Sequence, residues 1–185
     1  MILPKFVYAK AQSTEDAVRL YHKFGGKGLY FAGGTDIIPR LKLRLHTPHA
    51  LIDLKHIEEL NGVAVGSGQV SIGANTTLFE LRNHRAVREH FPALSESLAA
   101  TASETLQMRG TIGGNILQDT RCLFYNQSLQ WRSAKGFCFK MGGKQCNAVP
   151  GGKTCFAGYC ADNAPALLSL SARVALYGID GERTI

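Results

Sequence analysis

Ala32-Gly33-Gly34-Thr35-Asp36 is the stretch that decides the fold, and Thr111-Ile112-Gly113-Gly114-Asn115 repeats its pattern further along the 185-residue chain. A pyrophosphate needs several backbone N–H groups pointing at it, and side chains would block that approach, so paired glycines suit it. Taken alone, the first turn is also an ordinary strand-to-helix turn. Two such turns favour a phosphate-bearing ligand held between two lobes.

The first turn lies within a pattern typical of a small α/β lobe over residues 1–56. The lobe is expected to contain a helix capped by Ser13, a buried strand over 28–32, a helix over 37–45 and a second buried strand over 50–54. No G-x-G-x-x-G follows the first strand, which argues against a dinucleotide fold of the Rossmann type.

Residues 57–185 predict a second lobe, of α+β type. Its expected elements are a hairpin around Gly66-Ser67-Gly68, a helix capped by Thr76 or Thr77, helices from Phe91 and over 164–170, and a strand over 173–177. Residues 179–185 predict a turn whose next strand is missing, as in a chain cut from a longer one.

The composition is that of a globular protein, with 45% hydrophobic residues. No stretch approaches the roughly 18 apolar residues of a membrane span, and the opening residues 1–5 do not predict a signal peptide. We therefore expect a cytoplasmic protein, in which cysteine clusters more often bind metal than form disulfides. The net charge of +7 admits a nucleic-acid partner, although a solvated basic face explains it equally well.

Five cysteines crowd into the segment 118–160, which we call the cysteine segment. They are Cys122, Cys138, Cys146, Cys155 and Cys160, separated by 15, 7, 8 and 4 residues. A loop this long is uncommon without function, so we predict that its thiolates bind a metal. The spacing matches neither the C-x2-C knuckle of zinc sites nor the C-x2-C-x2-C of bacterial ferredoxins. Spacing therefore does not separate zinc from iron–sulfur.

Charge favours the second of these two metal centres slightly. The cysteine segment carries six basic residues and one acidic residue, Asp119. A 4Fe–4S cluster with four thiolates is negatively charged, and the basic residues would offset that charge.

Three motifs together resemble a known family. They are the two glycine turns and Ala161-Asp162-Asn163-Ala164-Pro165-Ala166-Leu167. They look like the flavin motifs of the FAD-binding medium subunits of molybdenum hydroxylases, which include carbon monoxide dehydrogenase and xanthine dehydrogenase. The resemblance covers essentially the whole chain and implies a two-lobed α+β fold of the PCMH-like type. The family's C-terminal domain would be absent, and the cysteine segment would be an insertion between the second turn and Asp162.

That insertion is similar to the one in the β subunit of 4-hydroxybenzoyl-CoA reductase, which holds an additional 4Fe–4S cluster. The likeness is carried by the stretch 118–128 and by Trp131-Arg132 and Gly136-Phe137-Cys138. It implies that Cys122, Cys138, Cys146 and Cys155 are the cluster ligands. Cys160 has no matched role and is expected to be a free thiol.

The resemblance also implies the FAD contacts. They are Leu29, Tyr30, Phe31, Ala32, Gly33, Gly34, Thr35 and Asp36 in the first pyrophosphate loop, Thr111, Ile112, Gly113, Gly114 and Asn115 in the second, and Thr101 and Asp162. Asp162 would accept hydrogen bonds from the ribityl chain, and it also suits the N-cap of the helix that follows. No catalytic residue is expected on this chain.

The implied protein relays electrons within a larger enzyme that reductively dehydroxylates 4-hydroxybenzoyl-CoA to benzoyl-CoA. Its partners would be a molybdopterin-binding large subunit and a 2Fe–2S small subunit, in a heterotrimer that dimerises, with a ferredoxin-like electron donor. The alternatives are the FAD subunit of another molybdenum hydroxylase, a self-contained flavin reductase on the same fold, and a zinc-binding basic module for nucleic acid. The flavin reductase would need a substrate domain, and the module would need aromatic residues along one basic platform.

Overall fold

The computed structural model describes residues 2–66 and 68–185, which form two compact units. Unit 1 consists of Asp36–Thr47, Gln118–Cys160 and the N-terminal residues up to Lys5. Unit 2 consists of Phe6–Thr35, Pro48–Leu117 and Ala161–Ile185. The cysteine segment is thus packed with the residues that follow the first glycine turn, whereas both glycine pairs and Asp162 belong to unit 2.

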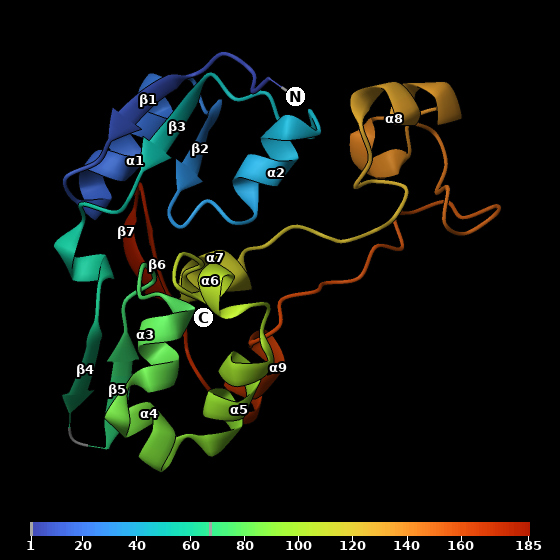
Figure 1. Ribbon diagram of the computed structural model, residues 1–185. Coiled ribbons are helices and arrows are strands. Elements are labelled where there is room, and N and C mark those ends of the chain that lie inside the picture. The colour runs from blue at the N-terminus through green and yellow to red at the C-terminus, as the bar shows by residue number, and fades with distance from the viewer. Residues whose placement is uncertain (1, 67) are drawn as a thin grey trace. The chain divides into compact units, whose positions relative to one another are not determined.

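Unit 2 contains a three-stranded parallel sheet in the order β1-β3-β2. Its strands are β1 (Val7–Lys10), β3 (Ala50–Asp53) and β2 (Gly28–Phe31), and α1 (Thr14–Lys23) packs against β2 and β3 (Figure 1). All four residues of β3 are buried, as its apolar sequence predicts for a central parallel strand. The edge strand β1 was not expected from the sequence, because three of its four residues are exposed and carry no buried apolar run.

The expected helix α1 begins and ends as its sequence predicts. The Ser13 hydroxyl accepts a hydrogen bond from the Asp16 N–H at 3.1 Å, which caps the first turn. Gly25 and Gly26 follow the helix with φ of 62° and 70°, a left-handed conformation that glycine adopts without strain.

The rest of unit 2 is a hairpin followed by a set of short helices. The elements are η1 (Glu58–Leu60), β4 (Val63–Gly66), β5 (Gln69–Ile72), α3 (Leu78–Asn83), α4 (Arg85–His90), α5 (Pro92–Ala100), α6 (Glu104–Gln107), α7 (Ile112–Ile116), α9 (Ala164–Ser169), β6 (Ala175–Gly178) and β7 (Gly181–Thr184). Strands β4 and β5 confirm the predicted hairpin, although Ser67 at its tip lies outside the described residues. Thr77 caps α3 in a capping box with Glu80.

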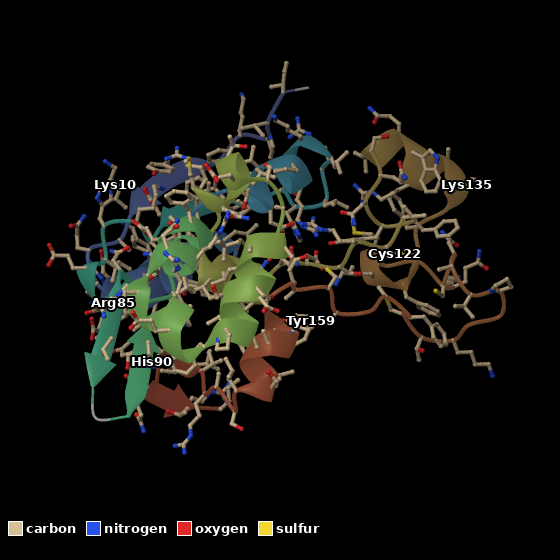
Figure 2. All side chains as sticks on the ribbon, turned by 60° about the horizontal axis from the view of Figure 1, so that its bottom comes forward. Lys10, Arg85, His90, Cys122, Lys135 and Tyr159 are labelled. Carbon is tan, nitrogen blue, oxygen red and sulfur yellow. The ribbon has the colours of Figure 1, made fainter. Side chains whose placement is uncertain are left out.

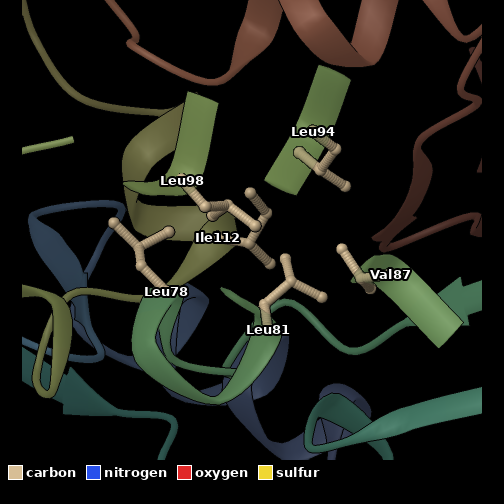
Figure 3. Packing of buried hydrophobic residues seen from close by; sticks show 6 residues of the cluster. All are labelled: Leu78, Leu81, Val87, Leu94, Leu98 and Ile112. Carbon is tan, nitrogen blue, oxygen red and sulfur yellow. The ribbon is translucent and has the colours of Figure 1, made fainter. Parts of the chain in front are cut away.

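One hydrophobic core holds these helices together. Its buried side chains are Leu78, Leu81, Val87, Leu94, Leu98 and Ile112, which converge in Figure 3. They come from α3, α4, α5 and α7, so burial of this core fixes the second glycine turn against the helices before it.

The end of the chain corrects one expectation. The strand predicted to be missing after residue 179 is present: β7 pairs antiparallel with β6, with Ala175 opposite Thr184. A sequence of Gly-Glu-Arg-Thr gives little apolar signal, and all but its first residue are exposed.

Unit 1 is organised by two buried arginines rather than by a large apolar core. Its elements are α2 (Ile37–Lys42), α8 (Leu129–Lys135) and η2 (Phe139–Met141). Arg40 is 2% exposed and donates to Asp36 at 2.7 Å and to the Asp119 carbonyl at 2.8 Å. Arg132 is also 2% exposed and donates to the carbonyls of Leu43 and Arg44. A solvated basic face is therefore the wrong interpretation of these two residues.

No helix among residues 2–66 and 68–185 combines the length and apolar character needed to cross a membrane.

Candidate functional site

The first glycine turn presents backbone donors. Within the described part of the chain, the N–H groups of Gly33, Gly34 and Thr35 donate no hydrogen bond. Gly34 has a φ of 78°, the left-handed conformation that turns successive N–H groups toward one side. Three consecutive N–H groups without an acceptor fit an anion such as a pyrophosphate.

Gly33 is required for a different reason. A Cβ atom at this position would lie 1.8 Å from the Arg109 carbonyl oxygen and 3.1 Å from the Gly110 Cα. The first turn therefore lies directly against the backbone that leads into the second turn. This close approach brings the two glycine motifs together within unit 2.

The backbone donors of the second turn are already used. Ile112 and Gly113 donate to the carbonyls of Thr76 and Ala74, at 3.0 and 2.9 Å. Gly114 donates to the Thr111 hydroxyl at 3.1 Å and Asn115 to the Thr111 carbonyl at 2.9 Å. The second turn therefore offers a ligand the exposed face of Gly114 rather than a row of free N–H groups.

A polar network joins the second turn to two other predicted contacts. The Asn115 amide donates to the Asp162 carboxylate at 2.8 Å, and its oxygen accepts from the backbone and side-chain nitrogens of Asn163, both at 3.1 Å. The Asn163 oxygen accepts from the hydroxyls of Ser97 at 2.9 Å and Thr101 at 3.3 Å. Thr101, Asn115 and Asp162, far apart in sequence, are thus brought into one cluster.

Asn163 and Ser97 were missed by the sequence reasoning. Asn163 follows Asp162 directly and is fully buried, but the sequence carries no signal of that burial or of its partners. It also takes the N-cap position of α9 that was considered for Asp162, although its side chain makes no capping hydrogen bond. The Asp162 side chain instead lies exposed, where it can accept hydrogen bonds from hydroxyl groups.

The remaining predicted flavin contacts have different surroundings. Leu29, Tyr30 and Phe31 lie in β2, where Tyr30 stacks on Tyr21 with ring centroids 5.8 Å apart. Asp36 belongs to unit 1, where its carboxylate pairs with Arg40 and with Arg121, each at 2.7 Å.

The cysteine segment places its four predicted metal ligands around one pocket. Of these four, Cys122 is labelled in Figure 2. The pocket is lined by Cys122, Cys138, Cys146 and Cys155 together with Phe124, Tyr125, Phe139 and Lys140. Cys160 is not among the lining residues, and its thiol donates to the Asp119 carbonyl at 3.3 Å. The four cysteines therefore share one pocket, and their role as metal ligands stays a prediction.

The four thiols do not converge on one point. Across residues 2–66 and 68–185, no three His, Cys, Asp or Glu side chains lie close enough to hold a single metal ion. A zinc ion needs such convergence, since Zn–S distances are about 2.3 Å. A four-iron cluster does not, because each thiolate bonds to a different iron. The four-iron cluster at these cysteines stays a prediction.

One positively charged side chain, Lys140, and one backbone donor to a cysteine lie at this pocket. Lys140 lies 3.0 Å from the Asp119 carboxylate and 5.3 Å from the centre of the Tyr125 ring. Burial would raise the pKa of Asp119, but hydrogen bonds from Tyr125 and Lys140 outweigh it and lower this pKa to about 2. A backbone hydrogen bond from Phe156 lowers the pKa of the Cys146 thiol, which favours the thiolate that binds metal.

The comparison with protein families identifies the kind of domain that this chain forms. Residues 4–185 match the family described as the FAD binding domain in molybdopterin dehydrogenase. The chain belongs to this family. The resemblance to the FAD-binding medium subunits of molybdenum hydroxylases is thereby confirmed, whereas the likeness to 4-hydroxybenzoyl-CoA reductase stays a prediction.

Individual members of the family are similar over part of their length. The carbon monoxide dehydrogenase medium chain of Hydrogenophaga pseudoflava is 37% identical over 116 residues, which is 63% of this chain and 40% of the relative. The aldehyde oxidoreductase FAD-binding subunit of Escherichia coli (strain K12) is 30% identical over 174 residues, 91% of this chain and 54% of the relative. This chain therefore spans about half the length of these relatives.

The fold agrees with these matches. Reconstituted CO dehydrogenase from Oligotropha carboxidovorans superimposes with a TM-score of 0.73 at 29% identity, covering 100% of this chain and 51% of that chain. The architecture is therefore that of an FAD-binding domain of mixed helix and sheet.

Proposed function

We propose that this chain is the FAD-binding, electron-relaying part of a molybdenum hydroxylase, with the flavin held in unit 2. The proposal rests on one observation: unit 2 holds both three N–H groups at Gly33–Thr35 that donate no hydrogen bond and the exposed carboxylate of Asp162. The N–H groups bind the pyrophosphate, and Asp162 accepts hydrogen bonds from the ribityl hydroxyls. Bound FAD supplies the redox chemistry, while the protein supplies binding and orientation.

We further propose that the cysteine segment is an insertion that holds a 4Fe–4S cluster. Cys122, Cys138, Cys146 and Cys155 would hold it, one thiolate to each iron, in the pocket that they line. Lys140 offsets part of its negative charge from the wall of the same pocket. The cluster supplies one-electron transfer to or from the flavin. Cys160 lies outside the ligand set.

The parent enzyme we favour is of the 4-hydroxybenzoyl-CoA reductase type, from the sequence likeness around 118–138. The chain would then work in the cytoplasm with a molybdopterin-binding large subunit, a 2Fe–2S small subunit and a ferredoxin-like donor, in a dimerised heterotrimer. A second candidate is an aldehyde oxidoreductase, because the alignment with that FAD-binding subunit extends over 91% of this chain. Both candidates share the lobes proposed at 1–56 and 57–185 and differ in the substrate of the partner subunit.

A quantitative spectrum of protein purified without oxygen tests the proposal. We expect one FAD and about four irons per chain, with broad absorption near 400 nm that bleaches on reduction. One zinc per chain and negligible iron would refute the cluster, and absence of flavin from the assembled enzyme would refute the FAD site. The substrate is tested separately, by assaying the assembled enzyme with 4-hydroxybenzoyl-CoA and with aromatic aldehydes.

A further inference from the structure

We propose that Asn163 is a positioning residue for the flavin, because it fixes the orientation of the Asn115 side-chain amide and, through it, the carboxylate of Asp162. The inference rests on the proposed FAD site. It adds an uncharged residue that lies outside both glycine turns in the sequence.

Asn163 is fully buried and its polar groups are all paired. Its backbone N–H and its side-chain amide both donate to the Asn115 Oδ1, each at 3.1 Å. Its Oδ1 accepts from the hydroxyls of Ser97 at 2.9 Å and Thr101 at 3.3 Å. Asn163 therefore joins the end of α5 to α7.

This pairing determines which end of the Asn115 amide faces Asp162. A carboxamide has its acceptor on one side and its donors on the other. Because two donors of Asn163 occupy the Asn115 Oδ1, the Asn115 Nδ2 points the opposite way and donates to the Asp162 Oδ2 at 2.8 Å. A reversed Asn115 amide would place its oxygen against the Asp162 carboxylate, which would be repulsive.

The local structure shows that the network takes precedence over capping. Asparagine at an N-cap commonly accepts a hydrogen bond from the first helical turn. Asn163 stands at the N-cap of α9 with a φ of −93° and ψ of −9°, and its side chain makes no capping bond. The side chain is turned into the network instead, leaving Asp162 exposed above it.

Two substitutions separate positioning from space filling. Asn163→Asp has nearly the same shape but replaces the side-chain donor with an oxygen facing the Asn115 Oδ1. Asn163→Ala removes all the side-chain contacts and keeps only the backbone N–H that donates to the Asn115 Oδ1. In the assembled enzyme stripped of flavin, we expect the FAD dissociation constant to rise roughly tenfold or more in both variants. Asp162→Ala is the reference for loss of the flavin contact itself.

The control is Ile57→Val, which lowers stability in a buried cluster with Ala11, Ala17 and Ile52 and touches no member of the network. Its dissociation constant for FAD should equal that of the parent. Urea unfolding of each variant identifies the folded population, so that affinity is compared among folded molecules.

The outcomes are distinct. If Asp162→Ala weakens FAD binding while folded Asn163→Asp and Asn163→Ala bind FAD as the parent does, Asn163 is not a positioning residue and the proposed site stands. If Asp162→Ala also binds FAD as tightly as the parent, the proposed site fails and the inference fails with it. Weaker binding in all three variants, with the Ile57→Val affinity unchanged, supports both.

Discussion

At the scale of single residues, the four glycines of the two turns have different roles. Gly33 allows close contact between backbones, and Gly34 supplies a left-handed φ. Gly113 lies close to Ala74, whose carbonyl oxygen would be 2.8 Å from an added Cβ atom. Gly114 is exposed, and an added Cβ atom would meet only the Thr111 hydroxyl, at 3.0 Å.

Gly114→Ala therefore tests ligand contact without destroying the fold. We expect this variant to stay folded, because alanine is favoured over glycine in a helix, and to bind FAD at least roughly tenfold more weakly. Gly33→Ala should instead unfold unit 2 or displace its turns, since the Cβ atom would overlap the Arg109 carbonyl. Circular dichroism and FAD titration separate the two effects. A folded Gly114→Ala variant with parental affinity would show that Gly114 does not face the flavin.

The lowered pKa of Asp119 predicts that the stability of unit 1 depends on pH. Its folded pKa of about 2 lies below the ordinary value of 3.8, so its contribution to stability is present above about pH 4 and is lost as the pH falls toward 2. Asp119→Asn should cost about 2 kcal/mol at pH 7 and progressively less below pH 4. Urea unfolding across this range measures the difference.

The control for Asp119→Asn is Glu182→Gln in the exposed strand β7, which should change stability by less than about 0.5 kcal/mol. A cost for Asp119→Asn that stays constant from pH 7 to pH 2 would contradict the role of the charged carboxylate.

At the scale of elements, the cysteine segment is ordered by polar contacts from its own helices and loops. Ser128 caps α8 by accepting from the Trp131 N–H at 3.2 Å, and Tyr125 donates to Asp119 at 2.7 Å. Tyr125 also lines the cysteine-lined pocket, so one of these contacts fixes part of its wall.

Cysteine substitutions test that site. Changing Cys122, Cys138, Cys146 or Cys155 to Ser should remove the iron, because each thiolate is expected to hold one iron of the cluster. Cys160→Ser should leave about four irons per chain, since its thiol is not part of the pocket. The measurement is iron analysis of protein prepared without oxygen. Loss of iron in Cys160→Ser would show that Cys160 is a cluster ligand and that one of the other four cysteines is not.

Lys140 is expected to tune the proposed cluster by its charge. Lys140→Gln should lower the reduction potential, because removing a positive charge from the pocket wall makes an added electron less favourable. Lys135→Gln is the matched control, as Lys135 is exposed and does not line the pocket. Redox titration followed by electron paramagnetic resonance measures both. Equal shifts in the two variants would indicate a general charge effect instead.

At the scale of the whole molecule, the elements with strong local signals were predictable. The central strand β3, the capped helices α1 and α3 and the hairpin β4–β5 follow from apolar patterns and caps. Strand β1 was not predicted, and the strand now labelled β7 was expected to be absent. Both strands are mostly exposed and carry no apolar alternation. Their existence depends on a partner strand that a local pattern does not reveal.

The candidate site was only partly predictable for the same reason. The motifs identified Thr101, Asn115 and Asp162, but the buried Asn163 that joins them depends on the packing of α5, α7 and the start of α9. Likewise, the burial of Arg40 and Arg132 depends on contacts across roughly eighty residues of sequence. Long-range polar contacts of this kind have no signature in a short window.

An experimental structure of the assembled enzyme with FAD bound is the most direct test of the proposed flavin site. We expect pyrophosphate oxygens about 2.7–3.2 Å from the N–H groups of Gly33, Gly34 and Thr35, and a ribityl hydroxyl within the same distance of Asp162. FAD bound elsewhere, or a flavin that leaves both the Gly33–Thr35 donors and Asp162 without contact, would contradict it.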